Sequence, residues 1–357
     1  MISFEPTEEQ NVVRDMAAKI AGDVLSSTFQ RADRDSQLNP DAMNALWSLG
    51  LVQAQLDARA QITNAIVLEE LAARDAVAAG ALATSMAFAQ AVADHGAPAQ
   101  RQWAQSHFAS DDFQAAAIAW AEPRVAFDPA KLATTAKRDG DGFVLDGEKS
   151  LVPLAETATH FLVIADGSGA PAAFIVEATA PGVSVSPYAG TLGLRALRMA
   201  NVKFSNVKLA GAARLGGEAP LDVARLQAAS RIGASALMCG LSRAVYDYVV
   251  PYTKERVAHG TAVARKQSVA FRIADMHIEI EAMRWMNWRA ASELEKRLPA
   301  AARSAFLAQL YAAEQVMWIG DEGVQLLGGH GFVRAHPVEQ WYRDARTLSV
   351  LEGAFGV

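Results

Sequence analysis

The sequence predicts an α+β protein of three parts: an N-terminal helical domain, a middle β-barrel-like domain and a C-terminal four-helix bundle. Two observations lead to this prediction. The chain has 357 residues, which is too long for one small core. Its apolar residues recur at helical spacing before about residue 110 and after about residue 217, whereas short alternating runs separated by turns lie between. We therefore place the domains at 1–112, 113–217 and 218–357.

The first part reads as helix throughout. Thr7 followed by Glu8 and Glu9 is typical of a helix start, because a threonine side chain caps the first amides and acidic residues favour the first turn. A long alanine-rich stretch then predicts one or two helices that end at Gly96.

Asp-Gly pairs recur in the middle part. The segments KRDGDGFVLDGEKS and HFLVIADGSGAPAAFIVEA are typical of hairpins with the Asp-Gly pairs at the bends. The segment ANVKFSNVKLA alternates between apolar and polar residues, as a half-buried strand does. These patterns predict an all-β insert between two helical regions.

The third part returns to a helical period. Within 264–297 the apolar residues are spaced by four, three, four and three positions, at Val269, Ile273, Met276, Ile280 and Met283. A second segment, beginning near Phe306, repeats this spacing. Long helices separated by short breaks predict an antiparallel bundle.

Charge and cysteine content limit the function classes. A net charge of −6 argues against nucleic acid and anionic membranes as main partners. Cys239 has no second cysteine to pair with, and MISFEPTEEQ lacks the basic start and apolar core of a signal peptide. The uncharged stretch 76–93 is alanine-rich, so we expect a buried helix there and no membrane span. We expect a cytoplasmic protein.

General catalytic motifs give little information here. The sequence holds no HExxH, CxxC or G-x-S-x-G motif, and we expect no metal site. By itself, GGHGF indicates no more than a helix cap, and WYRDAR is typical of a surface ion-pair cluster.

Several motifs nevertheless occur together in a fixed order. The run QLLGGHGFVRAHPVEQWYRDARTLSVLEG contains Q-x-x-G-G-x-G-aromatic, then P-V-E, R-D-A and an E-G pair. YTKERVAHG and KQSVAFRIADM precede it, and TLGLRALRMANVKFSNVKL lies in the middle part. With these motifs the chain resembles the acyl-CoA dehydrogenase family over nearly its whole length. The resemblance implies that family's order of helices, β domain and four-helix bundle.

The resemblance also implies a reaction. Such enzymes use FAD to oxidise the Cα–Cβ bond of an acyl-CoA thioester, while a carboxylate removes the α-proton. Glu352 matches the base of the family's E-G pair, and Ala224 stands where some relatives carry the base on a bundle helix. We expect Glu352 in an apolar, water-poor site, because such a site raises a carboxyl pKa toward that of a weak carbon acid. The alternative is a solvated tail carboxylate.

Cofactor positions follow from the same resemblance. Arg256, Gln325 and Gly329, with Gly328 beside it, match positions that hold the diphosphate and adenine of a neighbouring subunit's FAD. A guanidinium fork suits a diphosphate, and glycines let the backbone approach it. The alternatives are that the glycines only cap a helix and that Arg256 only pairs with a nearby acid. Glu122 matches the family's flavin-face motif in the middle domain and is a further cofactor-binding candidate.

Two residues match positions near the substrate thioester and the pantetheine entrance. These are Asp222 and Arg225, in the segment LDVARL. The alternative is that both are ordinary residues at the start of a helix.

The flavin face of the middle domain departs from the family pattern. In WAEPRVAFD a family hydroxyl is replaced by Ala121, and a Gly-Ser pair by Ala126–Phe127. In SLVPLAE the position of a second hydroxyl is Val152 or Pro153, and neither side chain can donate a hydrogen bond. The positions for the chain's own FAD are therefore altered, whereas those for a neighbour's FAD are kept.

Two hypotheses follow. The chain is an active FAD-dependent acyl-CoA dehydrogenase that passes electrons to an electron-transfer flavoprotein, in a homo- or hetero-oligomer such as a tetramer. Alternatively, it is a non-catalytic or supporting subunit of a heteromeric acyl-CoA dehydrogenase and lends Arg256, Gln325 and Gly329 to a partner's FAD.

Overall fold

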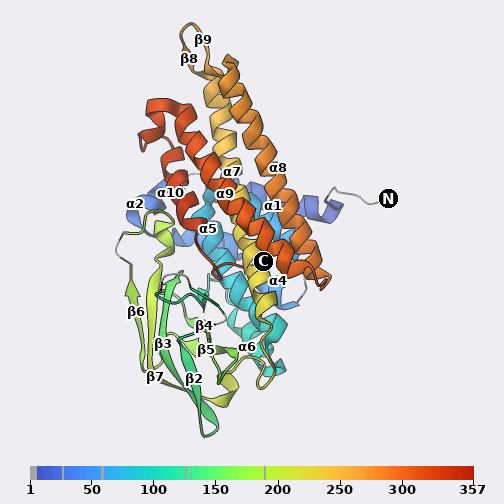
Figure 1. Ribbon diagram of the computed structural model, residues 1–357, viewed down its shortest axis with the longest axis vertical. Helices are drawn as coiled ribbons and strands as arrows, with labels where there is room; N and C mark the ends of the chain where they lie inside the picture. The colour runs from blue at the N-terminus through green and yellow to red at the C-terminus, as the bar shows by residue number, and fades with distance from the viewer. Residues whose placement is uncertain (1–5, 26–27, 58–59, 125–126, 130, 189) are drawn as a thin grey trace.

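The sheet lies at one end of the molecule beside several helices, and a helical bundle extends to the other end in the computed structural model (Figure 1). It describes residues 6–25, 28–57, 60–124, 127–129, 131–188 and 190–357. The predicted loss of a Gly-Ser pair falls partly on Ala126, which lies outside these residues. The three-part architecture predicted from the sequence is confirmed: a helical region, a curled sheet and a second helical region.

The N-terminal region is built from helices, as predicted. Thr7 caps the first of them, because its Oγ1 accepts a hydrogen bond from the Gln10 amide at 3.2 Å. The helices are α1 (Glu8–Val24), α2 (Phe29–Asp35), α3 (Pro40–Trp47), α4 (Leu51–Asp57), α5 (Gln61–His95) and α6 (Pro98–His107).

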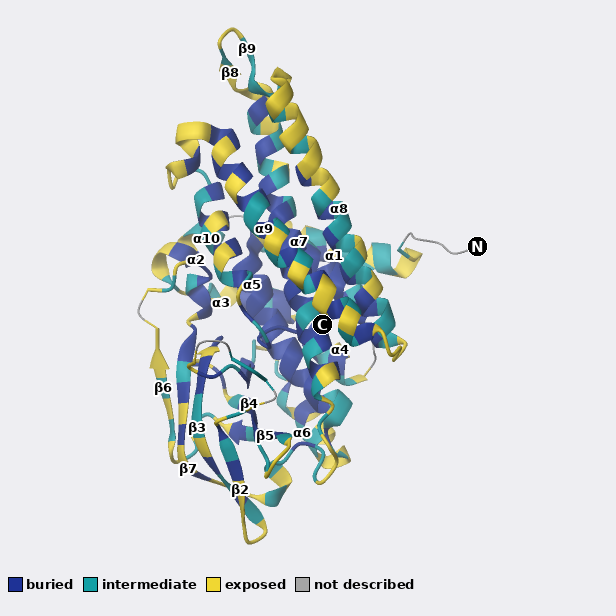
Figure 2. Cartoon of the chain, viewed as in Figure 1, coloured by how far each residue is buried: buried dark blue, intermediate teal, exposed yellow. Residues whose placement is uncertain are grey.

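Helix α5 is the central helix of the fold, and its residues are mostly buried (Figure 2). It consists of two helical halves joined at Asp75, where the backbone leaves the helical region at φ −153° and ψ 100°. The Asp75 carboxylate accepts hydrogen bonds from the amides of Val77 and Ala78 and so caps the second half. That half ends at Gly96, as predicted. By length and composition α5 could cross a membrane, but 94% of its most apolar window is buried inside this fold.

A seven-stranded mixed sheet forms the middle region. Its order is β1-β4-β2-β3-β7-β6, with β5 paired to β4. Strand β4 runs parallel to β1 and β2, and the other pairs are antiparallel. The strands are β1 (Ala116–Ala119), β2 (Thr135–Asp139), β3 (Gly142–Val152), β4 (His160–Asp166), β5 (Pro171–Glu177), β6 (Val183–Pro187) and β7 (Ala200–Leu209).

Four helices form the C-terminal region. They are α7 (Val223–Glu255), α8 (Gln267–Glu295), α9 (Ala301–Leu327) and α10 (Val338–Leu348). A small hairpin of β8 (Val257–Ala258) and β9 (Thr261–Ala262) joins α7 to α8. The helical period predicted for α8 is correct, since Met276, Ile280 and Met283 are buried.

The central helices α5 and α7 approach each other closely. A β-carbon at Gly240 of α7 would lie 2.4 Å from the Glu69 carbonyl oxygen of α5, so only glycine fits. This contact ties the N-terminal helices to the C-terminal bundle. The candidate site lies where these two helices meet the end of β1.

Candidate active site

Glu352 lies where the helices meet the sheet. It follows α10, and Gly353 after it has a left-handed φ of +74°. A β-carbon at Gly353 would lie 2.9 Å from Cε3 of Trp120, the residue that follows β1. A larger residue would collide with the indole, so glycine allows the chain to bring Glu352 up to the end of β1.

The Glu352 carboxylate is paired with an arginine of α7. Its Oε1 accepts a hydrogen bond from Nε of Arg231 at 3.0 Å, and Nη2 of the same side chain lies 2.8 Å away. The Arg231 guanidinium also lies over the ring of Phe306, 5.1 Å from its centroid. The ion pair and the aromatic contact together hold the carboxylate in one orientation.

This environment differs from the apolar, water-poor site that the sequence led us to expect. The Glu352 side chain is 33% exposed, and its hydrogen-bond partner is a cation. A solvated tail does not describe it either, because Leu351 and Ala354–Val357 on its two sides are buried. Glu352 is therefore a carboxylate on a buried segment that opens to solvent on one side. Its role as a base stays a prediction.

Four of the predicted cofactor residues come together in a second place. Arg256, Gln325, Gly328 and Gly329 line one cavity of about 410 Å³. It lies between the C-terminal ends of α7 and α9 and the N-terminal end of α8, next to the β8–β9 hairpin (Figure 1). The hairpin lies at the far end of the bundle from the sheet, so this cavity and Glu352 are separate features of the chain.

The chemistry of this cavity suits an anion. Arg256 is exposed, and Arg272 of α8 is half-exposed while it pairs with Glu322 at 2.7 Å. Gly328 has a φ of +59°, which favours glycine, and a β-carbon at Gly329 would meet no atom within 4 Å. Guanidinium groups beside open backbone and a helix N-terminus are the donors that a diphosphate needs. The cavity therefore fits the diphosphate end of FAD.

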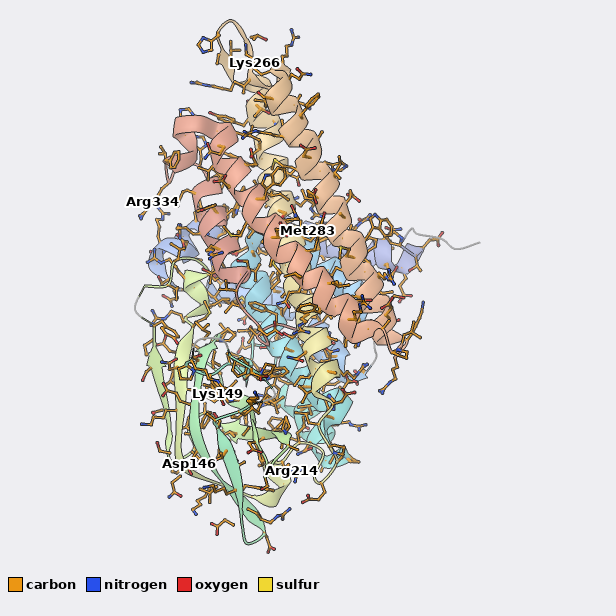
Figure 3. All side chains as sticks on the ribbon, viewed as in Figure 1. Asp146, Lys149, Arg214, Lys266, Met283 and Arg334 are labelled. Atoms are coloured by element: carbon orange, nitrogen blue, oxygen red, sulfur yellow. The ribbon has the colours of Figure 1, made fainter. Side chains whose placement is uncertain are left out.

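Glu122, by contrast, is used inside the middle domain. Its carboxylate accepts hydrogen bonds from the amides of Ala133 and Thr134 at 2.8–3.1 Å. Nζ of Lys149 lies 3.0 Å from Glu122 Oε1, and both side chains are almost fully buried. Figure 3 labels Lys149 in the part of the sheet nearest the helices. Glu122 thus holds the connection between β1 and β2, and its binding of a cofactor stays a prediction.

The pair carries opposing pKa effects. Burial lowers the pKa of Lys149 to about 8, although the Glu122 carboxylate opposes this shift. Burial opposes ionisation of Glu122 as well, but the amides of Thr134 and Ala133 and the Lys149 ammonium outweigh it and lower the pKa of that carboxyl. The pair is therefore a buried structural ion pair.

The predicted substrate residues also have partners within the chain. Asp222 is the N-cap of α7, and its Oδ1 accepts a hydrogen bond from the Arg225 amide at 3.0 Å. The buried Arg225 guanidinium binds the Asp94 carboxylate, with Nε 2.8 Å from Oδ2, and donates to the Leu294 carbonyl at 3.1 Å. These contacts match the alternative of helix-start residues. Binding of substrate by these two residues stays a prediction.

The flavin-face positions Ala121, Val152 and Pro153 carry no hydroxyl, and the neighbouring hydroxyl residue is Ser150. The Ala121 carbonyl accepts a hydrogen bond from the Ser150 amide at 2.8 Å, which joins the ends of β1 and β3. Leu151, Val152 and Pro153 follow, and all three side chains are apolar. The Trp120 indole lies against Gly353 beside them, and its buried Nε1 has no hydrogen-bond partner among the described residues.

Sequence reasoning missed three residues of this region. Arg231 is the partner of Glu352, Lys149 is the partner of Glu122, and Trp120 is the indole against the E-G pair. A signal for Arg231 was present, because it is an arginine within the otherwise small and apolar run AASRIGASALMCG. A partner that lies about 120 positions along the chain cannot be read from such a run.

Three domains of one known family match successive parts of the chain. The acyl-CoA dehydrogenase N-terminal domain matches residues 7–111, the middle domain residues 117–207 and the C-terminal domain residues 223–357. The chain belongs to the acyl-CoA dehydrogenase family. Members of this family are FAD-dependent oxidoreductases, so the protein is an enzyme of this type and its cofactor is FAD.

Curated relatives of this acyl-CoA dehydrogenase align over nearly its full length. The short/branched chain specific acyl-CoA dehydrogenase of Bos taurus mitochondria is 27% identical, over 98% of this chain and 84% of the relative. The cyclohex-1-ene-1-carbonyl-CoA dehydrogenase of Geobacter metallireducens is 26% identical, over 97% and 95%. Among solved structures, butyryl-CoA dehydrogenase from Megasphaera elsdenii superposes with a TM-score of 0.90 at 26% identity, over 98% and 95%.

Proposed function

We propose that this protein oxidises the Cα–Cβ bond of an acyl-CoA thioester to the 2-enoyl-CoA, with Glu352 as the base that removes the α-proton. The position of Glu352 carries this proposal. The E-G pair places a carboxylate between α7 and the end of β1, and the Arg231 contact at 2.8 Å orients it. A positioned carboxylate base is typically worth about 10²–10⁴ in rate.

Each group of the chain has one task in this proposal. Glu352 takes the α-proton onto a carboxylate oxygen, and, as the family resemblance implies, the backbone amide of the same residue donates a hydrogen bond to the thioester oxygen. Arg256, Gln325, Gly328 and Gly329 bind the diphosphate and adenine end of FAD, which supplies the acceptor for the β-hydride. An electron-transfer flavoprotein then takes the electrons away.

The proposal requires an oligomer, because Glu352 and the cavity around Arg256 are separate parts of the chain. The cavity that holds Arg256 lies at the far end of the bundle from the E-G pair, so a FAD bound there serves the Glu352 of another subunit. An assembly of like or unlike subunits satisfies this geometry.

Turnover tests the proposal. The protein, loaded with FAD and given butyryl-CoA and an electron acceptor, should form the 2-enoyl-CoA product. If the loaded protein binds butyryl-CoA and forms none of this product, the proposed reaction is wrong.

A second function is favoured by one observation, the absence of hydroxyl side chains at the three flavin-face positions near the end of β1. The Trp120 indole fills the space beside Gly353, and Ala121, Val152 and Pro153 provide no hydroxyl donor. These features fit a supporting subunit that lends Arg256, Gln325 and Gly329 to a partner's FAD. Native mass spectrometry distinguishes the two functions: one FAD for each copy of this chain supports the active enzyme, and FAD only in the presence of an unlike subunit supports the second function.

A further inference from the structure

Two residues of α8 line the same cavity as Arg256. Ser268 and Arg272 are four positions apart, so they lie one helical turn from each other on one side of α8. Both border the cavity of about 410 Å³ that Arg256 borders from the end of α7. Figure 3 labels Lys266, just before α8, at the end of the bundle farthest from the sheet. The cavity thus lies where α7 ends and α8 begins.

The connection between these two helices holds their ends together. The Val263 amide donates a hydrogen bond to the Arg256 carbonyl at 2.8 Å, and the Lys266 amide donates one to the Val263 carbonyl at 3.0 Å. Arg256 is the C-cap of α7 and Lys266 is the N-cap of α8, so these bonds join the two caps. The backbone therefore keeps Arg256 near the first turns of α8.

Arg272 has hydrogen-bond donors that its partner does not use. Its Nη1 donates to Oε2 of Glu322 on α9 at 2.7 Å, and this is the one hydrogen bond of the Arg272 side chain within the described residues. The arginine side chain is 48% exposed, whereas that of Glu322 is 10% exposed. A guanidinium group carries five N–H donors. The contact with Glu322 therefore fixes the orientation of the group and leaves donors for a ligand.

The charges around the cavity favour an anion. Arg256 and Arg272 each bring a positive charge, and no acidic residue is among the described residues that line the cavity. Ser268 adds an exposed hydroxyl, which can donate to a phosphate oxygen. A diphosphate has two phosphate groups, and a guanidinium group binds a phosphate through paired N–H donors. The two arginines thus match the two phosphates in number and in chemistry.

We propose that Arg272 and Ser268 of α8 bind the diphosphate of FAD together with Arg256 of α7. The inference rests on the proposed function, which assigns this cavity to the diphosphate and adenine end of FAD. It gives a binding role to two residues for which the family resemblance implies none. The ADP half of FAD should therefore bind here in the absence of the flavin half.

Titration calorimetry with ADP tests the inference on the full-length chain after its flavin has been removed. The wild type should bind ADP, and its affinity should fall as KCl is added, because exposed guanidinium groups attract the phosphates. Arg272→Met should bind ADP about tenfold more weakly, since it loses hydrogen bonds to a charged group. Its affinity should also depend less on salt. Ser268→Ala should lose a smaller factor.

Glu322→Gln is the matched control, because it breaks the same ion pair and keeps the guanidinium group in the cavity. This variant should bind ADP at least as tightly as the wild type, since a competing negative charge is gone. Arg272→Lys keeps the charge without the planar fork, so its affinity should lie between those of the wild type and Arg272→Met. Arg289→Met removes another arginine of α8, which pairs with Glu293 at 2.9 Å outside the cavity, and should leave the affinity unchanged.

The possible results separate binding from a structural role. Equal weakening in Arg272→Met and Glu322→Gln would show that Arg272 only ties α8 to α9. Wild-type affinity in Arg272→Met, or a wild type that binds no ADP at millimolar concentrations, would overturn the inference. Wild-type affinity in Ser268→Ala would remove Ser268 from the site.

The proposed function is judged by a different measurement, the turnover of butyryl-CoA by the FAD-loaded wild type. If ADP binds as predicted and butyryl-CoA is not turned over, the diphosphate site stands and the proposed reaction is wrong. If butyryl-CoA is turned over and Arg272→Met binds ADP like the wild type, the reaction stands and the role of Arg272 is wrong.

Discussion

Lys149 and Glu122 form an ion pair that is buried in the sheet. The ammonium lies 3.0 Å from Glu122 Oε1 and 3.0 Å from the Trp120 carbonyl, and the two side chains are 0% and 2% exposed. Loss of one member leaves the other charged and buried without a counter-charge, which typically costs about 3–5 kcal/mol. The pair joins β3 to the connection that leads from Trp120, so it also supports the wall of the candidate site.

We therefore predict that Lys149→Met lowers the free energy of unfolding by about 3–5 kcal/mol in urea denaturation. Lys208→Met is the matched control, because Lys208 pairs with Asp139 on the surface with both side chains more than half exposed. This control should cost less than about 1 kcal/mol. Equal losses in the two variants would mean that the buried pair has no special structural role.

At the scale of elements, α10 fixes the loop before β7. The buried Asp344 of α10 accepts a hydrogen bond from the Leu194 amide at 2.6 Å. A β-carbon at Gly193 would lie 2.2 Å from the Arg343 carbonyl oxygen, so the loop backbone touches the helix directly. This contact links the bundle to the loop that leads into β7.

Asp344 makes this contact dependent on pH. Burial raises its pKa to about 7, a shift that the Leu194 amide and Arg343 oppose and that Asp33 and Asp75 reinforce. The folded protein keeps this proton up to about pH 7, whereas an unfolded aspartic acid loses it near pH 4. The free energy of unfolding should therefore fall as the pH rises from about 4 to 7.

Asp344→Asn removes the carboxyl whose titration makes the free energy of unfolding depend on pH. We predict that the stability of the variant relative to the wild type increases by up to about 1.4 kcal/mol for each pH unit in that window. Urea denaturation at several pH values measures this gap. Asp111→Asn, at an exposed position, should follow the wild type throughout. A gap for Asp344→Asn that is independent of pH would show that the carboxyl is ionised in the folded protein.

Local patterns predicted most of these elements, and tertiary contacts account for the rest. The cap at Thr7 and the buried stripe of α8 depend on neighbouring residues, so the sequence alone was sufficient for them. The break in α5 at Asp75 depends on a side chain that caps its own helix. The alanine-rich sequence around Asp75 gives no signal of this break. The Arg231 partner of Glu352 required the fold, because α7 and the E-G pair meet only in three dimensions.

At the scale of the whole molecule, one face of α8 carries large apolar side chains that are exposed. Phe271 and Ile278 are each 60% exposed and Trp285 is 41% exposed, at intervals of seven residues along the helix. Figure 2 shows exposed positions along much of this helix. An apolar stripe of this kind typically marks a protein interface. It supports the proposed oligomer, in which the cavity around Arg256 is completed by another subunit.

We predict that Ile278→Lys dissociates the assembly, because it places a charge at the centre of this stripe. Light scattering should show a smaller species, and the bound FAD should be lost with it. Glu177→Lys on β5 is the control with an added cation at an exposed position, and it should leave the assembly intact. An Ile278→Lys protein of unchanged mass would contradict the role of this face.

The most direct test of the account is the rate at which butyryl-CoA reduces the FAD of the loaded protein under anaerobic conditions, compared between the wild type and Glu352→Gln. Glutamine keeps the shape of the side chain and cannot take the α-proton, so we predict a rate lower by about 10²–10⁴ with butyryl-CoA still bound. Glu177→Gln should react like the wild type. Reduction of Glu352→Gln at the wild-type rate would contradict the role of Glu352 as the base.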